Sequence, residues 1–189
     1  MAALILLLLA ARSSLADHYV VPTGSMEPTL HPGDRVLVDK TAYGVRIPFT
    51  DWNVTALREP RRGDIAVFDS PEDGTRLIKR VVAVAGDRVS VTDGRLTING
   101  RSLTSPLEPG VERYPDRAVR LDLRFGGGPD VPPTTVPEGH VLALGDSRGN
   151  SRDSRFFGFV PARRLYARAL GIYFRSGDGL VWLSLTPEV

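Results

Sequence analysis

The chain has 189 residues, of which 42% are hydrophobic and 24% are charged, and its formal net charge is +2. These values are those of an ordinary globular protein and exclude wholesale disorder, and the length suits one domain with or without a small second lobe. The 19 Gly and 15 Pro disfavour a helical bundle and favour strands and turns. Without any Cys, a disulfide scaffold, a thiol nucleophile and a thiolate metal site are excluded, and the three scattered His do not suggest a metal site. A small net charge of mixed sign gives little basis for a nucleic-acid partner.

The basic residues are unevenly divided, because 22 are Arg and only two are Lys, Lys40 and Lys79. Arg stays charged in proteins, whereas Lys can lose its proton when it is buried. One interpretation is that the chain keeps Lys where it needs an amine that can be deprotonated. Codon bias, with two lysines remaining by chance, explains the same count, so the count alone does not decide between the two.

The N-terminus is apolar without interruption over residues 1–11, MAALILLLLAA. A membrane-spanning helix needs about 20 such residues, but a helix continued to Ala16 would reach roughly 24 Å at about 1.5 Å per residue. That nearly spans a thin bilayer if Arg12 extends to the headgroups. We therefore favour a membrane anchor over residues 1–16, complete or truncated at its start. A cleaved signal peptide ending at Ala16 and a buried core segment remain alternatives.

Short apolar and β-branched runs, separated by turn residues, follow the N-terminus and predict a series of strands. Asp93 and Gly94 form the strongest hairpin signal, and residues 176–179 form a second one. Residues 102–137 contain seven Pro and a run of three Gly, which predicts a loop-rich small lobe or an insertion. Outside the N-terminus, the best helix candidate covers residues 161–169. The predicted strands cover residues 19–21, 35–38, 65–68, 77–85, 89–91, 96–98, 141–144, 170–174 and 180–185.

Two clusters of polar residues, at 22–30 and 145–155, could carry chemistry. Ser25 lies at the centre of the first, where two Pro and a Gly restrict the backbone to an irregular loop. A Ser in such a loop most often makes only a turn hydrogen bond. The second cluster, GDSRGNSRDSR, follows a predicted strand. It is either a charged, solvated turn or a set of groups that holds catalytic residues in place.

Lys79 interrupts the apolar run at residues 77–85. On a strand it shares one face with Leu77 and Val81, while Arg80 lies on the other. If the face of Lys79 is buried, desolvation lowers the pKa of the amine, and the neutral amine can act as a base. Alternatively, Lys79 and Arg80 belong to a solvated edge strand.

These segments, taken in order along residues 4–170, resemble bacterial type I signal peptidases, the membrane-anchored Ser/Lys endopeptidases that remove signal peptides. Each segment alone is modest evidence, whereas all of them in order are highly specific. The matching segments are PTGSMEPTL at 22–30, AYGVRIPF at 42–49, RGDIAVF at 62–68, KRVVAVAGD at 79–87, GDSRGNSRDSR at 145–155 and GFVP at 158–161. Residues 145–155 depart from the common form of the family at Ser147, where Asn is usual, and at Gly149, where Asp is usual.

The resemblance implies a catalytic role for three residues. Ser25 would be the nucleophile and Lys79 the general base. The N–H of Ser25 and the hydroxyl of Thr23 would form the oxyanion hole, although Ser is more usual than Thr at that position. The residues implied for the pocket that receives the residue before the cut are Val21, Met26, Leu30, Leu77 and Ile78.

Four further residues would support the catalytic pair. Ser151 would hydrogen-bond Lys79 and orient it. Asp153 and Arg155 would form an ion pair, with Asp146 beside them.

The family fold is all-β, so we expect a mainly β protein in three parts. These are an antiparallel β-rich catalytic core over residues 17–91 and 138–189, an inserted small β/loop lobe over residues 92–137, and a short membrane helix over residues 1–16. The implied function is that of a membrane-bound serine endopeptidase that removes N-terminal signal peptides from exported preproteins. It would cut after small residues at −1 and −3, without a metal or cofactor.

The resemblance also implies a place in the cell. A single-pass anchor would hold the chain in the cytoplasmic membrane, with the catalytic domain on the extracytoplasmic side. The partners would be signal peptides of secreted preproteins and membrane lipids, not nucleic acid, and the oligomeric state is not indicated. Two alternatives remain open: a conjugation- or pilin-type processing peptidase of the same fold, and an inactive membrane-tethered β-domain that binds peptides.

Overall fold

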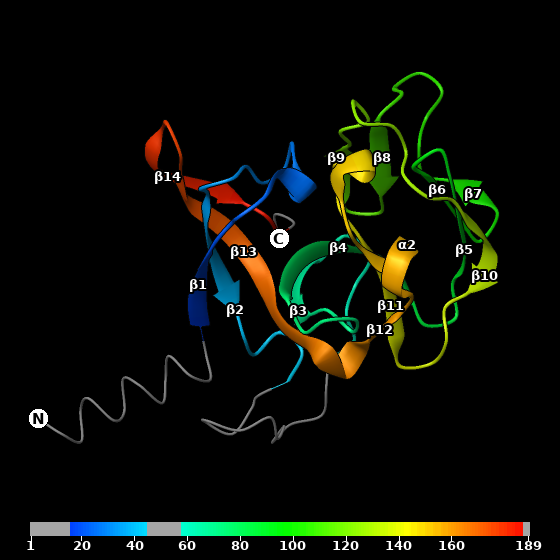
Figure 1. The fold of residues 1–189 in the computed structure, drawn as a ribbon, viewed down its shortest axis with the longest axis horizontal. Coiled ribbons are helices and arrows are strands. Elements are labelled where there is room, and N and C mark those ends of the chain that lie inside the picture. Colours follow the sequence, from blue (N-terminus) through cyan, green and yellow to red (C-terminus); the bar gives the residue numbers. More distant parts are fainter. Residues whose placement is uncertain (1–15, 45–57, 187–189) are drawn as a thin grey trace, which may run out of the picture.

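The structure, a computed structural model, describes residues 16–44 and 58–186, which form a mainly antiparallel β protein as expected (Figure 1). Its strands are β1 (Ala16–Val20), β2 (Arg35–Asp39), β3 (Ile65–Asp69), β4 (Arg76–Val84), β5 (Arg88–Thr92), β6 (Arg95–Ile98), β7 (Arg101–Ser102), β8 (Val111–Tyr114), β9 (Arg117–Arg120), β10 (Val131–Thr135), β11 (His140–Leu144), β12 (Val160–Pro161), β13 (Leu165–Arg175) and β14 (Gly179–Ser184). Its helical segments are the 3-10 helices η1 (Gly24–Met26), η2 (Arg148–Asn150) and η3 (Ala162–Arg164) and the α-helix α2 (Ser154–Phe157).

Each strand predicted from the sequence is present, and both predicted hairpins form. The turn between β5 and β6 shows why its residues were a strong signal. Asp93 and Gly94 have φ angles of 47° and 72°, and a tight two-residue hairpin turn requires positive φ at both central positions. The two turn residues therefore determine the register in which β5 and β6 pair.

The helix predicted over residues 161–169 is wrong. Only the short 3-10 helix η3 forms there, and β13 begins at Leu165. Leu165, Ala167 and Ala169 are buried and the residues between them are partly exposed, which is the period of a strand. Ala and Arg favour helices intrinsically, but pairing of β13 with β2 and β3 overrides that preference.

The larger sheet has the strand order β1-β2-β13-β3-β4-β11-β12, with β14 paired to β13. It curls so that its edge strand β1 approaches β4, where Nη1 of Arg76 donates a hydrogen bond of 3.0 Å to the hydroxyl of Tyr19. β1 pairs only with β2, and residues 76–79 of β4 pair with β3 but precede the pairing with β11. Within the described residues, two strand edges are therefore left open close to each other.

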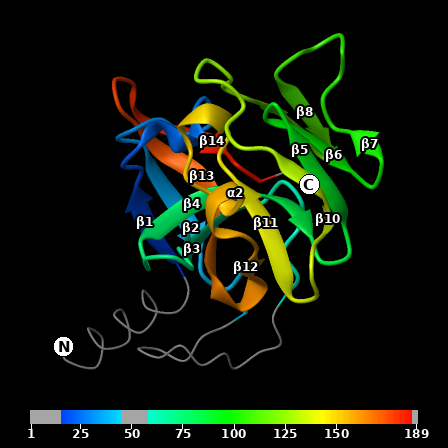
Figure 2. The same ribbon diagram turned by 45° about the vertical axis from the view of Figure 1, so that its right-hand side comes forward.

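A smaller sheet, β10-β5-β6-β7, and the hairpin β8-β9 lie on the side of the molecule away from β1 and β2 (Figures 1 and 2). Most of these strands fall inside residues 92–137, so the stretch rich in Pro and Gly contains ordered hairpins as well as loops. The smaller sheet itself begins slightly earlier, at Arg88. The division of the chain into domains at residues 92 and 137 stays a prediction.

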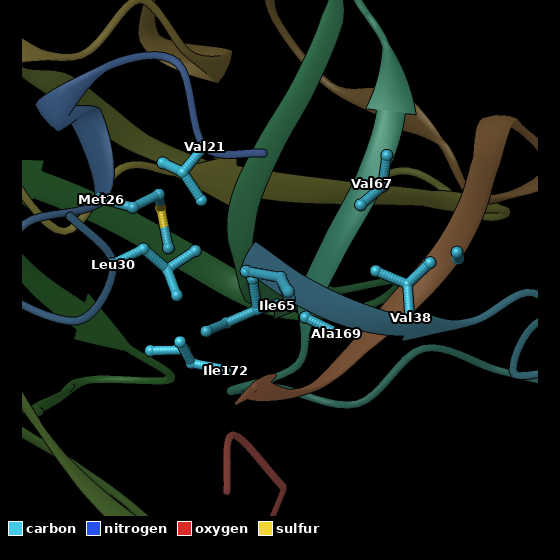
Figure 3. Close-up of a cluster of buried hydrophobic side chains, with 10 residues drawn as sticks. Val21, Met26, Leu30, Val38, Ile65, Val67, Ala169 and Ile172 are labelled. Carbon is cyan, nitrogen blue, oxygen red and sulfur yellow. The ribbon is translucent and has the colours of Figure 1, made fainter. Parts of the chain in front are cut away.

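A hydrophobic cluster joins the loop of residues 22–30 to the larger sheet (Figure 3). Val21, Met26 and Leu30 pack there against side chains of β2, β3 and β13, and Met26 and Leu30 are completely buried. Burying a side chain of this size contributes roughly 1.5–3 kcal/mol. The loop that carries Ser25 is therefore held in place by its own apolar residues.

The expected membrane anchor, residues 1–16, lies outside the described residues except for Ala16, and so do residues 45–49 of the second matching segment. Among the helices of residues 16–44 and 58–186, none has the length and hydropathy needed to cross a bilayer.

Candidate active site

Ser25 lies on the 3-10 helix η1, and its backbone is fixed by residues 145–155. The carbonyl of Ser25 accepts a hydrogen bond of 3.2 Å from the N–H of Ser147. Gly145 packs so closely against the same carbonyl that a Cβ at that position would collide with it. The irregular loop predicted around Ser25 is thus ordered both by its buried apolar residues and by this second segment.

Lys79 lies on β4 with its amine against Ser25. Lys79 and Arg80 are 3% and 2% exposed, so the alternative of a solvated edge strand is wrong. Nζ of Lys79 lies 2.5 Å from Oγ of Ser25. Burial lowers the pKa of Lys79 from 10.5 to about 8, while nearby carboxylates oppose the shift and Arg155 reinforces it.

This arrangement places a hydroxyl beside an amine that loses its proton near pH 8. A nucleophile within hydrogen-bond distance of a base whose pKa is close to the working pH is the pattern of nucleophilic catalysis. The hydroxyl of Thr23 lies at the same turn, with 3.3 Å between its Oγ1 and Oγ of Ser25. The structure therefore brings Thr23, Ser25 and Lys79 together, as the sequence predicted.

The expected supporting groups are only partly arranged as predicted. Asp153 and Arg155 form an ion pair of 2.8 Å, and the side chains of both are inaccessible to solvent. Asp153 also accepts a hydrogen bond of 2.9 Å from the N–H of Gly145 and caps helix α2, which the sequence analysis missed. The predicted hydrogen bond between Ser151 and Lys79 is not formed. Oγ of Ser151 is buried against Gly145 and has no hydrogen-bond partner in the described part of the chain.

Asp146 was expected beside that ion pair, but its carboxylate binds other residues. It accepts hydrogen bonds of 2.9 and 2.7 Å from Arg80 and one of 2.5 Å from the hydroxyl of Thr29. Sequence reasoning assigned no role to Arg80 or Thr29. A role for Arg80 could have been inferred from the sequence. When both faces of an interior strand are buried, a charged side chain on either face requires a counter-charge.

A third buried ion pair joins residues 145–155 to the lobe. Nη2 of Arg148 lies 2.7 Å from Oε2 of Glu112, both side chains are fully buried, and Nε of Arg148 donates a 3.0 Å hydrogen bond to the carbonyl of Gly145. Burial alone would lower the pKa of Arg148, but Glu112 raises it above the usual value. The alternative that residues 145–155 form a solvated turn is therefore wrong. Sequence reasoning missed Glu112, because no local pattern marks a partner 36 residues away.

Four of the five residues expected to form the pocket come together. Val21, Met26 and Leu30 belong to the cluster in Figure 3, and Ile78 packs against it. Leu77 packs instead in a different cluster, because successive residues of β4 point to opposite faces. Within residues 16–44 and 58–186, no group of His, Asp and Glu side chains is arranged to hold a metal ion.

Comparisons with known proteins identify the family. Residues 1–174 match the model of the signal peptidase family, peptidase S26. The chain is 36% identical over 198 residues to Signal peptidase I of Pseudomonas aeruginosa, with 91% of this chain and 69% of that protein covered. It is 32% identical over 171 residues to Signal peptidase I of Bacillus licheniformis, with 90% and 83% covered. A crystal structure of a signal peptidase I from Enterococcus faecalis matches at 30% identity with a TM-score of 0.40, covering 67% of this chain and 99% of that one. The chain therefore belongs to the signal peptidase family, peptidase S26, whose serine endopeptidases remove signal peptides.

Proposed function

We propose that this chain removes N-terminal signal peptides from exported preproteins, with Ser25 as the nucleophile and Lys79 as the general base. The observation that carries the proposal is the distance of 2.5 Å between Nζ of Lys79 and Oγ of Ser25. The lowered pKa of Lys79, about 8, supports it, because a base must be neutral to accept a proton. The match to the family supports the class of substrate.

The reaction proceeds by acyl transfer. Neutral Lys79 takes the proton of the Ser25 hydroxyl as the oxygen attacks the carbonyl carbon of the residue before the cut. The N–H of Ser25 and the hydroxyl of Thr23 donate hydrogen bonds to the oxyanion, and one such donor contributes about 2.7–4 kcal/mol. The Lys79 ammonium then protonates the leaving amine, and water hydrolyses the acyl-enzyme with Lys79 again as the base. Apart from this water, each step uses groups of the chain itself, so the mechanism requires neither a metal nor a cofactor.

The two open strand edges provide a binding site for the signal peptide. The edges of β1 and of residues 76–79 lead directly to Ser25 and Lys79, and both have backbone groups without strand partners among the described residues. An extended peptide can pair with such an edge by adding a strand to the sheet. The peptide would then lie with its scissile carbonyl against the catalytic pair.

The apolar residues near Ser25 explain a preference for small residues at −1 and −3. Met26 and Leu30 are completely buried, and Val21 and Ile78 pack in the same cluster. Because these side chains are packed together, a bulky side chain could enter the cluster only by displacing core residues. Overpacking of that kind typically costs about 1–3 kcal/mol.

The apolar residues 1–11 support a location in the cytoplasmic membrane, with one membrane pass and the catalytic residues on the extracytoplasmic side. In that position the site faces preproteins as they are exported, and membrane lipids surround the anchor. Fractionation should place the chain in membranes, and protease added from the outside should digest its catalytic core. Recovery of the intact chain only from the cytosol would contradict this location.

Cleavage of a signal-peptide substrate by purified variants tests the catalytic pair. Lys79→Arg keeps the positive charge and the hydrogen-bonding capacity but cannot deprotonate near pH 8. We expect Lys79→Arg and Ser25→Ala to lose several orders of magnitude in rate with the fold intact by circular dichroism. Lys40→Arg is the matched control and should retain activity, since Lys40 lies over the ring of Tyr166 and Arg can stack there too. Substantial cleavage by Lys79→Arg would contradict the proposed pair.

A panel of peptides that differ only at −1 tests the pocket. A peptide with Phe at −1 should be cut more than about tenfold more slowly than one with Ala, which corresponds to about 1.4 kcal/mol. Mass spectrometry of the products locates the cut. Equal rates for the two peptides would remove the pocket from the proposal while leaving the catalytic pair in place.

A further inference from the structure

Residues 121–128, which we call the strap, cross the segment 145–155 next to the nucleophile. Asp122 makes backbone hydrogen bonds of 2.9 and 3.0 Å to that segment, one as donor and one as acceptor. Its carboxylate also accepts a hydrogen bond of 3.0 Å from the hydroxyl of Ser147. Because the N–H of Ser147 donates to the carbonyl of Ser25, the strap is connected to the nucleophile through a single residue.

The strap packs closely against residues 145–155. A Cβ at Gly149 would collide with the carbonyl of Phe125, and a Cβ at Gly128 would lie 2.5 Å from Nη1 of Arg155. Gly149 and Ser147 are the two positions at which this segment departs from the common form of the family, and both contact the strap. These contacts fix the position of the strap beside the active site.

Arg124 extends from the strap toward the turn that carries Ser25. Its Nε and Nη2 donate hydrogen bonds of 2.9 and 3.0 Å to Asp122, and Nη2 lies 3.1 Å from Oε2 of Glu27. The Glu27 carboxylate in turn lies against η1, since a Cβ at Gly24 would be 3.0 Å from its Oε1. Among the described residues, Nη1 of Arg124 has no hydrogen-bond partner, so the guanidinium is held in place and can still donate to a ligand.

A cavity of about 600 Å³ opens between the strap and Pro28 of the nucleophile loop. Its charged lining consists of Arg95, Arg120 and Arg124 against Asp122 alone. Arg120 is exposed and has no acidic partner in the described ranges. Arg95 is paired with Asp93, and Arg124 is paired with Asp122 and Glu27. Among the described residues, Arg120 is therefore the lining charge that no carboxylate offsets, and it presents positive charge to a ligand.

The cavity reaches the nucleophile loop at Pro28, and neither Tyr19 nor Arg76 lines it. The open edges of β1 and β4 approach the catalytic pair from the side of Tyr19 and Arg76. Residues before the cut occupy that side. In this proposed pose, residues after the cut continue past η1 toward Pro28, which lines the cavity together with residues of the strap.

We infer that this cavity binds the first residues of the mature polypeptide, after the cut, and favours an acidic side chain there. Arg120 and Arg124 are the specificity-determining residues. This inference rests on the proposed function. A carboxylate gains from the uncompensated charge of Arg120 and can accept a hydrogen bond from Nη1 of Arg124, whereas a Lys or Arg side chain in the same place is repelled by Arg120. One exposed ion pair changes an affinity by about two- to fivefold, so a preference of that size is expected.

Two series of peptides test the inference. Each carries the same signal sequence, and Asp or Lys is moved through the second to sixth positions after the cut, with Gln as the neutral reference. The ratio of kcat/KM for Asp over Lys should reach about two- to fivefold at one or two positions, and it should fall when salt is added. Arg120→Gln should reduce the ratio and Arg120→Glu should reverse it. Arg164→Gln removes another exposed Arg, from η3, and should leave the ratio unchanged.

The outcomes separate this inference from the proposed function. If the unmodified protein cuts the Gln peptide but treats Asp and Lys alike at every position, the inference is wrong and the proposed function stands. If the ratio is unchanged in Arg120→Glu, whose fold is checked by circular dichroism, the cavity is not the source of the preference and the inference is again wrong. If no peptide is cut at all, the proposed function itself fails.

Discussion

Replacing Lys79 with Met should stabilise the fold at neutral pH while abolishing activity. The pKa of Lys79 is lowered from 10.5 to about 8, mainly by burial, and at about 1.4 kcal/mol per unit this disfavours the charged form by about 3 kcal/mol. Met has a similar length and suits an apolar environment. The variant loses the contact with Ser25, worth about 1 kcal/mol, so a net gain of about 2 kcal/mol in the free energy of unfolding is expected at pH 7.

The pH dependence of this gain has a definite sign. Between pH 8 and 10.5 the folded protein has released the Lys79 proton and the unfolded chain has not, so the unfolded state binds more protons. The stability of the unmodified protein therefore rises with pH across this window. The variant has no amine to titrate at this position, so its advantage is complete below about pH 8 and disappears as the pH approaches 10.5.

Urea unfolding followed by circular dichroism measures both free energies between pH 7 and pH 10. Ser25→Ala is the matched control, because it removes the hydroxyl but leaves Lys79 buried. This control should keep the rise in stability with pH that Lys79→Met loses. If Lys79→Met is no more stable than the unmodified protein at pH 7 and the difference stays constant up to pH 10, then Lys79 is not a desolvated amine and the reasoning fails.

Two further predictions concern the rate of cleavage, and a third concerns the buried ion pair of Arg148 and Glu112. The kcat/KM for a signal-peptide substrate should rise with pH along an ionisation near the Lys79 pKa of about 8, and a rate independent of pH between 6 and 10 would argue against a lysine base. Thr23→Val should lower kcat by about 10²–10³-fold with KM nearly unchanged, and Thr23→Ser, which keeps the hydroxyl, should restore it. Glu112→Gln should lower the free energy of unfolding by about 3–5 kcal/mol, because Arg148 is left unpaired in a fully buried site; thermal unfolding measures the loss, and a change below about 1 kcal/mol would mean that the pair is not buried in solution.

The strands and the reactive groups could be predicted from the sequence because local patterns determine them. The hairpin at Asp93 and Gly94 follows from turn chemistry, and the run around Lys79 has the β-branched composition of a strand. Both faces of β4 proved to be buried, which alternation alone does not reveal. The position of Ser25 between two Pro residues indicated a rigid loop, but only tertiary contacts with Gly145 show what makes it rigid.

The partners of the buried charges could not be predicted, because they depend on contacts between segments far apart in the chain. Arg80 and Asp146 are separated by 66 residues, and Arg148 and Glu112 by 36. Asp146 was placed near the other polar groups of its own segment, whereas the pairing of β11 with β4, in which Leu144 is opposite Arg80, brings it to Arg80. The helix predicted over residues 161–169 failed for the same reason, because its intrinsic preference yields to pairing with β2 and β3.

The distribution of Arg and Lys around the site explains how one amine becomes neutral among buried carboxylates. Asp153 and Asp146 both raise the pKa of Lys79, and unpaired they would keep it charged. Each is instead bound by its own guanidinium, Asp153 by Arg155 at 2.8 Å and Asp146 by Arg80 at 2.7 Å. Because Arg does not deprotonate in proteins, these partners stay charged at any working pH. The charges of the two carboxylates are therefore balanced by the two guanidinium groups. Burial remains the largest influence on the pKa of Lys79, so among these buried cations it is Lys79 that loses its proton.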